Sequence, residues 1–77
     1  MKRYVKASID KKTILTLLDN PECTYKIYVN DWNESKSYAA ELLSQSGATL
    51  SDIDRLKEGE EIQLGENTFY VDYDRIF

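Results

Sequence analysis

The chain has 77 residues, of which 42% are hydrophobic and 31% are charged, and its net charge at pH 7 is −4. This balance is typical of a folded protein and excludes a disordered chain, and the length leaves room for one domain spanning residues 1–77. No apolar run approaches the ~20 residues that span a bilayer, so we expect no membrane protein. A single cysteine and an N-terminus without a signal-peptide pattern predict a cytoplasmic protein.

The N-terminal part predicts a strand followed by a helix. Residues 2–7 mix Tyr4 and Val5 with charges that suit an edge strand. Ser8 or Asp10 can cap the helix, which Asn20-Pro21 ends. Its apolar stripe comprises Ile14, Leu17 and Leu18.

The segment Cys23 to Val29 alternates between apolar and polar residues, which predicts a strand with one buried face. Residues 30–33 predict a turn, in which Trp32 acts as a hydrophobic staple or as a contact residue.

Two further helices are expected after this turn. Asn33 or Ser35 caps the first, and Gly47 closes it in the left-handed conformation. Thr49 or Ser51 opens the second, which Gly59 terminates. The core-facing residues of the first are predicted to be Tyr38, Ala39, Leu42 and Leu43, and those of the second Ile53 and Leu56.

The C-terminal stretch predicts a β-hairpin. Gly65 as the first central residue of a two-residue turn favours type II′, which places Ile62 opposite Phe69 and Glu60 opposite Val71. A four-residue turn gives the same register. The chain is therefore predicted to be an α+β domain of order β-α-β-α-α-β-β. Its mainly antiparallel, three- to four-stranded sheet packs one face on two main helices, with the strand order left open.

Several kinds of chemistry have no residues to support them. The chain has no histidine, and its three glycines form no phosphate-binding loop. Asp72 and Asp74, near Glu61 across the hairpin, are the remaining catalytic candidates, but a solvated surface explains them more simply. Cys23 is expected to be a buried, inert thiol. We therefore predict no enzyme, no catalytic residue, no bound metal and no cofactor.

Charge is distributed unevenly along the chain. Residues 51–77 contain eight acids: Asp52, Asp54, Glu58, Glu60, Glu61, Glu66, Asp72 and Asp74. Residues 1–12 contain five basic side chains: Lys2, Arg3, Lys6, Lys11 and Lys12. Such runs usually mark solvated faces, and here they also suggest two opposite kinds of binding surface.

The first hypothesis is a protein-interaction module that binds a protein with a basic surface. One form of it is an acidic mimic of nucleic acid that inhibits or regulates a host protein. The candidate contact residues are Tyr28, Trp32, Glu61, Glu66, Tyr70, Asp72 and Asp74. Tyr28 and Tyr70 are predicted on faces opposite the core, where tyrosines either anchor a partner or cover the second face of the sheet. The sequence does not distinguish a monomer from a homodimer.

The alternative hypothesis is nucleic-acid binding through the basic N-terminal strand. Its candidate residues are Lys2, Arg3, Tyr4, Lys6, Lys11 and Lys12, with the cations on phosphates and Tyr4 stacked on a base. The net negative charge disfavours this reading.

The opening residues Met1 to Ser8, the tyrosine- and acid-rich composition and the short length resemble small orphan proteins of phages and integrative elements of low-GC Gram-positive bacteria. Some of that set, including anti-CRISPR and antirestriction proteins, inhibit host nucleases as acidic mimics. The resemblance covers the whole chain in style, without a shared motif, so it implies an interaction role and assigns no residue.

Overall fold

The computed structural model describes the backbone of residues 9–75 and the side chains of residues 9–73, so the predicted strand at residues 2–7 lies outside the described part. Its helices and strands in chain order are α1 (Lys11–Leu18), β1 (Cys23–Val29), β2 (Trp32–Glu34), α2 (Lys36–Gln45), α3 (Leu50–Lys57), β3 (Ile62–Leu64) and β4 (Asn67–Arg75). The predicted α+β class is confirmed, as is the order of the predicted elements within this range.

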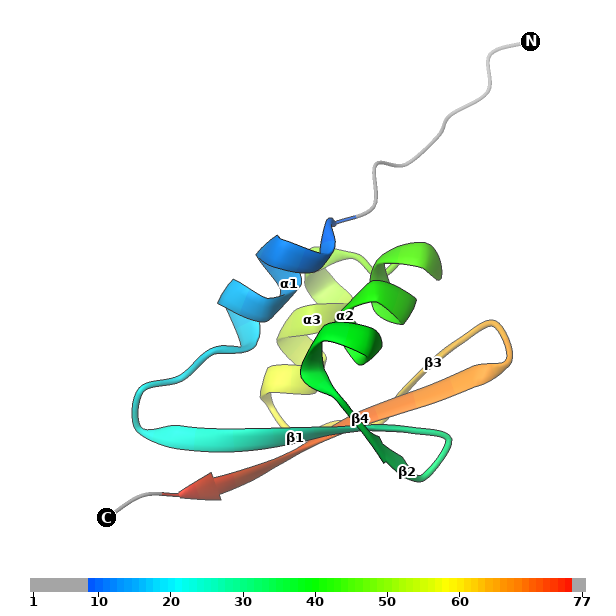
Figure 1. Ribbon diagram of the computed structural model, residues 1–77. Helices are drawn as coiled ribbons and strands as arrows, with labels where there is room; N and C mark the ends of the chain where they lie inside the picture. The colour runs from blue at the N-terminus through cyan, green and yellow to red at the C-terminus, as the bar shows by residue number, and fades with distance from the viewer. Residues whose placement is uncertain (1–8, 76–77) are drawn as a thin grey trace, which may run out of the picture.

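The strands form one antiparallel sheet of order β2-β1-β4-β3. β1 and β4 are its central strands and pair from Cys23 opposite Arg75 to Val29 opposite Phe69. The helices lie together on one face of this sheet, and no helix of the described chain covers the other (Figure 1). α2 packs on β1 and α3 packs on β3 and β4, while α1 packs chiefly on α2 and α3. Within the part of the chain that the structure describes, one face of the sheet is therefore free of helices, and we call it the open face.

β2 was not predicted, because the turn before it is shorter than expected. Asn30 and Asp31 have φ values of 53° and 70°. They alone separate Val29 from its partner Trp32, which corresponds to a two-residue hairpin turn with both central residues in the left-handed region. Asparagine and aspartate tolerate that region better than most residues. The chain consequently returns into the sheet at Trp32.

The hydrophobic core is one cluster between the helices and the sheet. Its largest fully buried side chains are Phe69, Ile14, Leu18, Ile27, Leu43, Ile53 and Leu56. The prediction for Tyr38 is wrong, since 51% of this residue is exposed. α2 contacts both α1 and β1, and its buried face is therefore centred on Ala39, Ala40 and Leu43.

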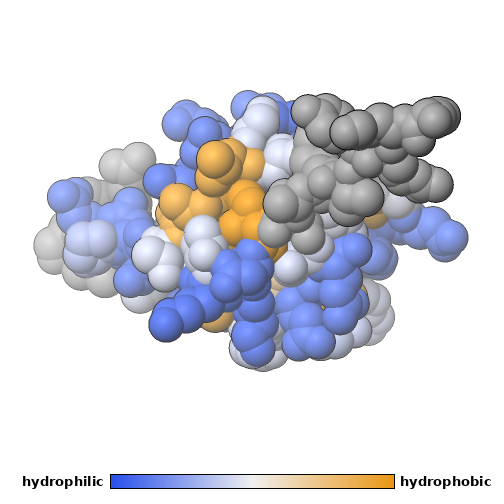
Figure 2. Space-filling model, turned by 90° about the horizontal axis from the view of Figure 1, so that it is seen from above, coloured by the Kyte–Doolittle hydropathy of each residue, from blue (hydrophilic) through white to orange (hydrophobic). Residues whose placement is uncertain are grey.

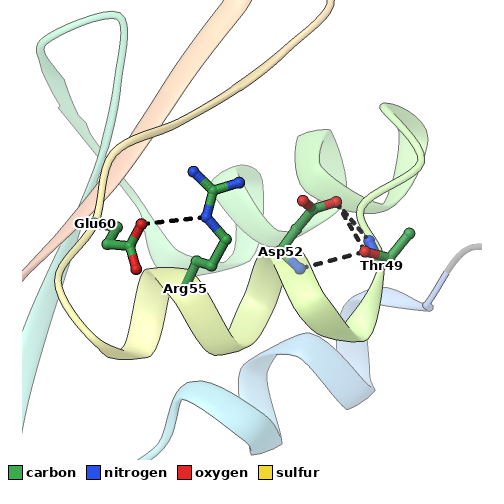
Figure 3. A network of polar contacts seen from close by, with 4 residues as sticks. All are labelled: Thr49, Asp52, Arg55 and Glu60. Carbon is green, nitrogen blue, oxygen red and sulfur yellow. Dashed lines mark hydrogen bonds and ion pairs between the residues drawn. The ribbon is translucent and has the colours of Figure 1, made fainter.

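Helix ends follow the predicted caps. Asp10, Ser35 and Thr49 accept backbone hydrogen bonds at the starts of α1, α2 and α3. Thr49 and Asp52 form a capping box, in which each side chain bonds the backbone amide of the other (Figure 3). Helices α2 and α3 end at a glycine of positive φ, as predicted.

The end of α3 also determines where β3 begins. Gly59 has φ +90°, and its amide donates to the Leu56 carbonyl at 2.9 Å. The next amide, that of Glu60, donates to the Arg55 carbonyl at 2.9 Å, which completes a Schellman motif. The Glu60 carboxylate also lies 3.3 Å from Arg55 Nε (Figure 3). These contacts hold Glu60 against the helix.

The C-terminal hairpin has the predicted turn and most of the predicted register. Gly65 has φ +62°, and Ile62 lies opposite Phe69. Pairing stops at Ile62, so the predicted pair of Glu60 and Val71 is not formed. The physical reason is the attachment of Glu60 to the end of α3.

Candidate binding surface

A stacked pair of tyrosines lies on the open face of the sheet. Tyr28 on β1 is directly opposite Tyr70 on β4, and alternation places both on the side away from the core. Their ring centroids are 4.7 Å apart and the ring planes differ by 4°. Both residues are half-buried without a helix above them. Each ring therefore covers one face of the other.

Three carboxylates lie close enough to Tyr70 to affect its hydroxyl. Partial burial raises the pKa of the Tyr70 hydroxyl, and the nearby carboxylates of Asp31, Asp72 and Glu61 raise it further. These three acids come from the β1–β2 turn, from β4 and from the segment before β3. Lys26 lies opposite Asp72 in the register and contributes one positive charge to the same face. We name Tyr28, Tyr70, Asp31, Glu61 and Asp72 the tyrosine face.

The two hairpin turns lie at the same end of the sheet. Asn30 holds them together, because its Nδ2 donates to Asn67 Oδ1 and its Oδ1 accepts from the Thr68 amide, both at 2.9 Å. The Asn30 amide also donates to the Thr68 carbonyl at 2.8 Å. Of the predicted contact residues, exposed Glu66 follows Gly65 in the β3–β4 turn and therefore belongs to this end.

Trp32 also lies at this end, at the start of β2, and is 72% exposed. Such exposure is incompatible with a hydrophobic staple. Of its two predicted roles, only that of a contact residue stays a prediction. Its register partner is the core residue Val29, so it belongs to the helical side of the sheet and not to the tyrosine face. Asp74 pairs with Thr24 through the backbone, and its side chain lies outside the described part.

The structure brings together four of the predicted contact residues: Tyr28, Glu61, Tyr70 and Asp72. Asp31 was not predicted as part of the surface. The pair Asn30-Asp31 between two apolar residues is a sequence signal for a tight hairpin turn. Its nearness to Tyr70, however, follows from the pairing of β1 with β4, which is a long-range contact.

A second tyrosine pair has a different environment. Tyr25 and Tyr73 lie on the core side of β1 and β4 with ring centroids 5.9 Å apart. Lys36 Nζ lies 4.1 Å from the centroid of the Tyr25 ring, within the range of a cation–π contact. Burial raises the pKa of both hydroxyls. These two tyrosines have structural contacts on the helical side, unlike the tyrosine face.

Other features of the described residues are less suited to a site. A shallow pocket is lined by Asn20, Cys23, Lys57, Glu58, Gly59 and Tyr73. Cys23 is partly accessible there and not buried as predicted, because it lies near the end of the sheet. Within residues 9–73 no group of three acids or cysteines is arranged to hold a metal ion.

The helical side carries apolar side chains within a mostly hydrophilic surface (Figure 2). Among the helix residues, Leu15, Leu17 and Leu42 are partly buried and Leu50 is exposed. None of the helices of the described chain is long and apolar enough to cross a membrane.

The residues of the nucleic-acid hypothesis fall mostly at the N-terminus. Lys2, Arg3, Tyr4 and Lys6 lie outside the described residues. Lys11 Nζ donates to Ser37 Oγ at 2.9 Å, and Lys12 is exposed on α1. The structure therefore leaves that hypothesis as a prediction.

No family model matches the chain, and searches of curated proteins and of solved structures found no similar protein.

Proposed function

We propose that this protein is a non-enzymatic interaction module that binds a basic protein surface through the tyrosine face. The stacked Tyr28–Tyr70 pair, half-buried on an open sheet face and surrounded by carboxylates, is the observation that supports this proposal. Tyrosines supply a large, rigid contact area, and they are frequent at the centre of protein interfaces. The cation of a lysine or arginine also binds favourably over a tyrosine ring.

The charge of the surface supports a basic partner. Asp31, Glu61 and Asp72 contribute three carboxylates to the tyrosine face, whereas Lys26 is the basic side chain in register with Asp72. A basic partner would be attracted from a distance and then held by short-range contacts with the rings. In one form of this function the carboxylates imitate the phosphates of a nucleic acid, so the partner is a nucleic-acid-binding protein that is inhibited or regulated. Competition by duplex DNA for the same partner tests that form.

The test is affinity capture from a lysate of the source organism, followed by calorimetric titration of the purified partner. Tyr70→Ala should weaken binding about 30-fold, the loss of a central interface residue. Its matched control is Tyr38→Ala, an exposed tyrosine on α2. Asp72→Asn should weaken binding and lower its dependence on salt, with Glu58→Gln on the exposed end of α3 as the control.

Urea unfolding of each variant separates loss of contact from loss of fold, and Asp72→Asn removes a charge with little change in shape. Equal affinity of the wild type, Tyr70→Ala and Asp72→Asn would refute the assignment of the surface. Affinity that does not change between low and high salt would refute the basic partner.

Nucleic-acid binding through the N-terminal basic residues is the alternative function. A low-salt titration of labelled single-stranded DNA tests it directly. Formation of a complex that is lost when Lys2, Arg3 and Lys6 are replaced by glutamine would favour this alternative.

A further inference from the structure

β4 is longer than the strand that pairs with its outer side. β4 extends from Asn67 to Arg75, but β3 pairs with Asn67–Phe69 only. On its other side β4 pairs with β1 as far as Arg75. Among the residues that the structure describes, β4 is therefore an edge of the sheet from Tyr70 onward.

The tight hairpin determines to which side each amide and carbonyl of β4 points. In a two-residue hairpin the flanking pair, here Leu64 and Asn67, is hydrogen-bonded, and hydrogen-bonded pairs then alternate. Odd-numbered residues of β4 consequently direct their amide and carbonyl toward β3, and even-numbered residues direct theirs toward β1. The bonds between Thr68 and Asn30 of the β1 side agree with this alternation. Val71 and Tyr73 thus direct their backbone groups to the side of β4 on which no strand of residues 9–75 lies.

The open edge is a consequence of the α3 cap. Continuation of β3 toward its N-terminus would pair Glu60 with Val71. Instead, the Glu60 amide bonds the Arg55 carbonyl and its carboxylate contacts the Arg55 guanidinium (Figure 3). The chain therefore stays at the helix end, and the Val71–Tyr73 section of β4 has no partner strand among the described residues. The corresponding edge of β1 is shorter, since the Cys23 amide already donates to the Asn20 carbonyl.

The side chains beside this edge differ between the two faces of the sheet. On the open face it borders Tyr70, Asp72 and the nearby carboxylate of Glu61. On the helical face it borders the pocket that Tyr73 and Gly59 help to line. An added strand alternates its side chains between these two environments. Basic residues suit the acidic open face, and uncharged residues suit the pocket side.

The carboxylates near this edge favour a strand from a basic partner over a strand from a second copy of this chain. Two copies joined at this edge would bring their own Asp72 and Glu61 carboxylates together, and like charges across strands are destabilising. Charged residues at an edge are a common protection against such self-pairing. A strand with basic side chains meets no such repulsion.

We propose that a partner of basic chemistry binds by adding an extended segment, antiparallel to β4, along Val71–Tyr73. Such a segment has a basic side chain at every second position, on the open face. This inference rests on the proposed function, since it concerns the same class of partner and the same carboxylates, and it adds the mode of binding. Main-chain hydrogen bonds supply affinity in this mode, and alternate side chains supply specificity.

The test is an NMR titration of the full chain with a synthetic heptapeptide of alternating lysine and valine, with amide hydrogen exchange measured before and after. In the free protein the amides of Val71 and Tyr73 should exchange fast, while those of Tyr70 and Asp72 should be protected by β1. With the peptide, exchange at Val71 and Tyr73 should slow by about tenfold or more, as expected for one new hydrogen bond each.

Two N-methylated peptides of equal composition provide the matched control. In an antiparallel pairing the valine amides face β4, so their N-methylation should weaken binding at least tenfold. N-methylation of the lysine amides, which face away, should leave affinity within about twofold. Equal effects of the two modifications would overturn strand addition.

Further outcomes separate the two proposals. A lysine peptide that binds in a salt-dependent manner without protecting Val71 and Tyr73 overturns strand addition and leaves the proposed function standing. A peptide with threonine in place of lysine that protects these amides equally well overturns the requirement for a basic partner. Absence of binding by the lysine peptide at low salt counts against both proposals.

Discussion

Replacement of Asn30 should loosen the end of the sheet that carries the two hairpin turns. Its side chain makes one hydrogen bond to the Thr68 amide and one to the Asn67 side chain, both across 37 or more positions of sequence. Its backbone has φ +53°, a region that costs most L-residues energy. Three variants separate these contributions: Asn30→Gly, Asn30→Asp and Asn30→Ala.

The expected losses in the free energy of unfolding follow from these contacts. Asn30→Gly removes both side-chain bonds without backbone strain and should cost about 1–2 kcal/mol, since an exposed hydrogen bond contributes roughly 0.5–1 kcal/mol. Asn30→Asp keeps the acceptor for Thr68 and loses the donor to Asn67, for a cost of about 1 kcal/mol. Asn30→Ala loses both bonds and adds left-handed strain of about 1 kcal/mol, for a total of about 2–3 kcal/mol. A domain of this size has only about 3–5 kcal/mol available.

Urea unfolding at 25 °C, followed by far-UV circular dichroism, measures these differences as shifts of the midpoint at constant slope. Hydrogen exchange at the Thr68 amide gives a local readout, and it should accelerate in the glycine and alanine variants and not in the aspartate variant. If Asn30→Gly is as stable as the wild type, the side-chain bonds contribute nothing and the reasoning is wrong. If the alanine and glycine variants are equal, the strain argument is wrong.

Three further substitutions test the turn, a helix start and a helix end. Asp31→Gly should raise the free energy of unfolding by about 0.5–1 kcal/mol in urea unfolding, because glycine adopts φ +70° without strain, and it should weaken partner binding. Hydrogen bonds to Thr13 lower the pKa of Asp10, so its cap stabilises the fold above about pH 4 and is lost as pH falls through the lowered value. Asparagine also caps helices, but it does not titrate. In acid unfolding, the free energy of unfolding of Asp10→Asn should therefore equal or exceed that of the wild type once the pH is below the lowered pKa of Asp10. Gly59→Ala places a methyl group in open space at φ +90°, so thermal unfolding should show a loss of about 1–2 kcal/mol that comes from backbone strain alone.

Elements with a repeated local pattern could be predicted from the sequence. β1 alternates over seven residues, and Asp10, Ser35 and Thr49 cap their helices as the sequence indicates. β2 has three residues, too few for any periodicity, and its presence depends on the conformation of the turn before it. The helical period also did not decide between Tyr38 and Ala40 as a buried residue of α2. That choice depends on where α1 and β1 lie, which is a matter of tertiary packing.

Only part of the tyrosine face could be predicted, because local patterns place each tyrosine but do not pair the strands. Alternation within each strand places Tyr28 and Tyr70 away from the core, and this was predicted correctly. That they stack on one another depends on the register between β1 and β4, which are separated in sequence by β2, α2, α3 and β3. The nearness of Asp31 to Tyr70 depends on the same register. Local sequence carries no information about that register.

The two tyrosine pairs of the sheet differ in the charges beside them. Tyr25 and Tyr73 pack beneath the helices, where Lys36 lies over the Tyr25 ring, so a positive charge accompanies that pair. The stacked pair on the open face is instead accompanied by the carboxylates of Asp31, Glu61 and Asp72.

A pair that merely covered the sheet would gain nothing from this negative surround. Under the proposed function, a basic partner would bring its cations close to these carboxylates and to the tyrosine rings. Asp72→Asn should separate stability from binding. It removes the carboxylate opposite Lys26, so the free protein should be equally stable or slightly less stable, and it removes an attraction in the complex. A loss of binding that clearly exceeds any loss of stability is the relation expected of a binding surface.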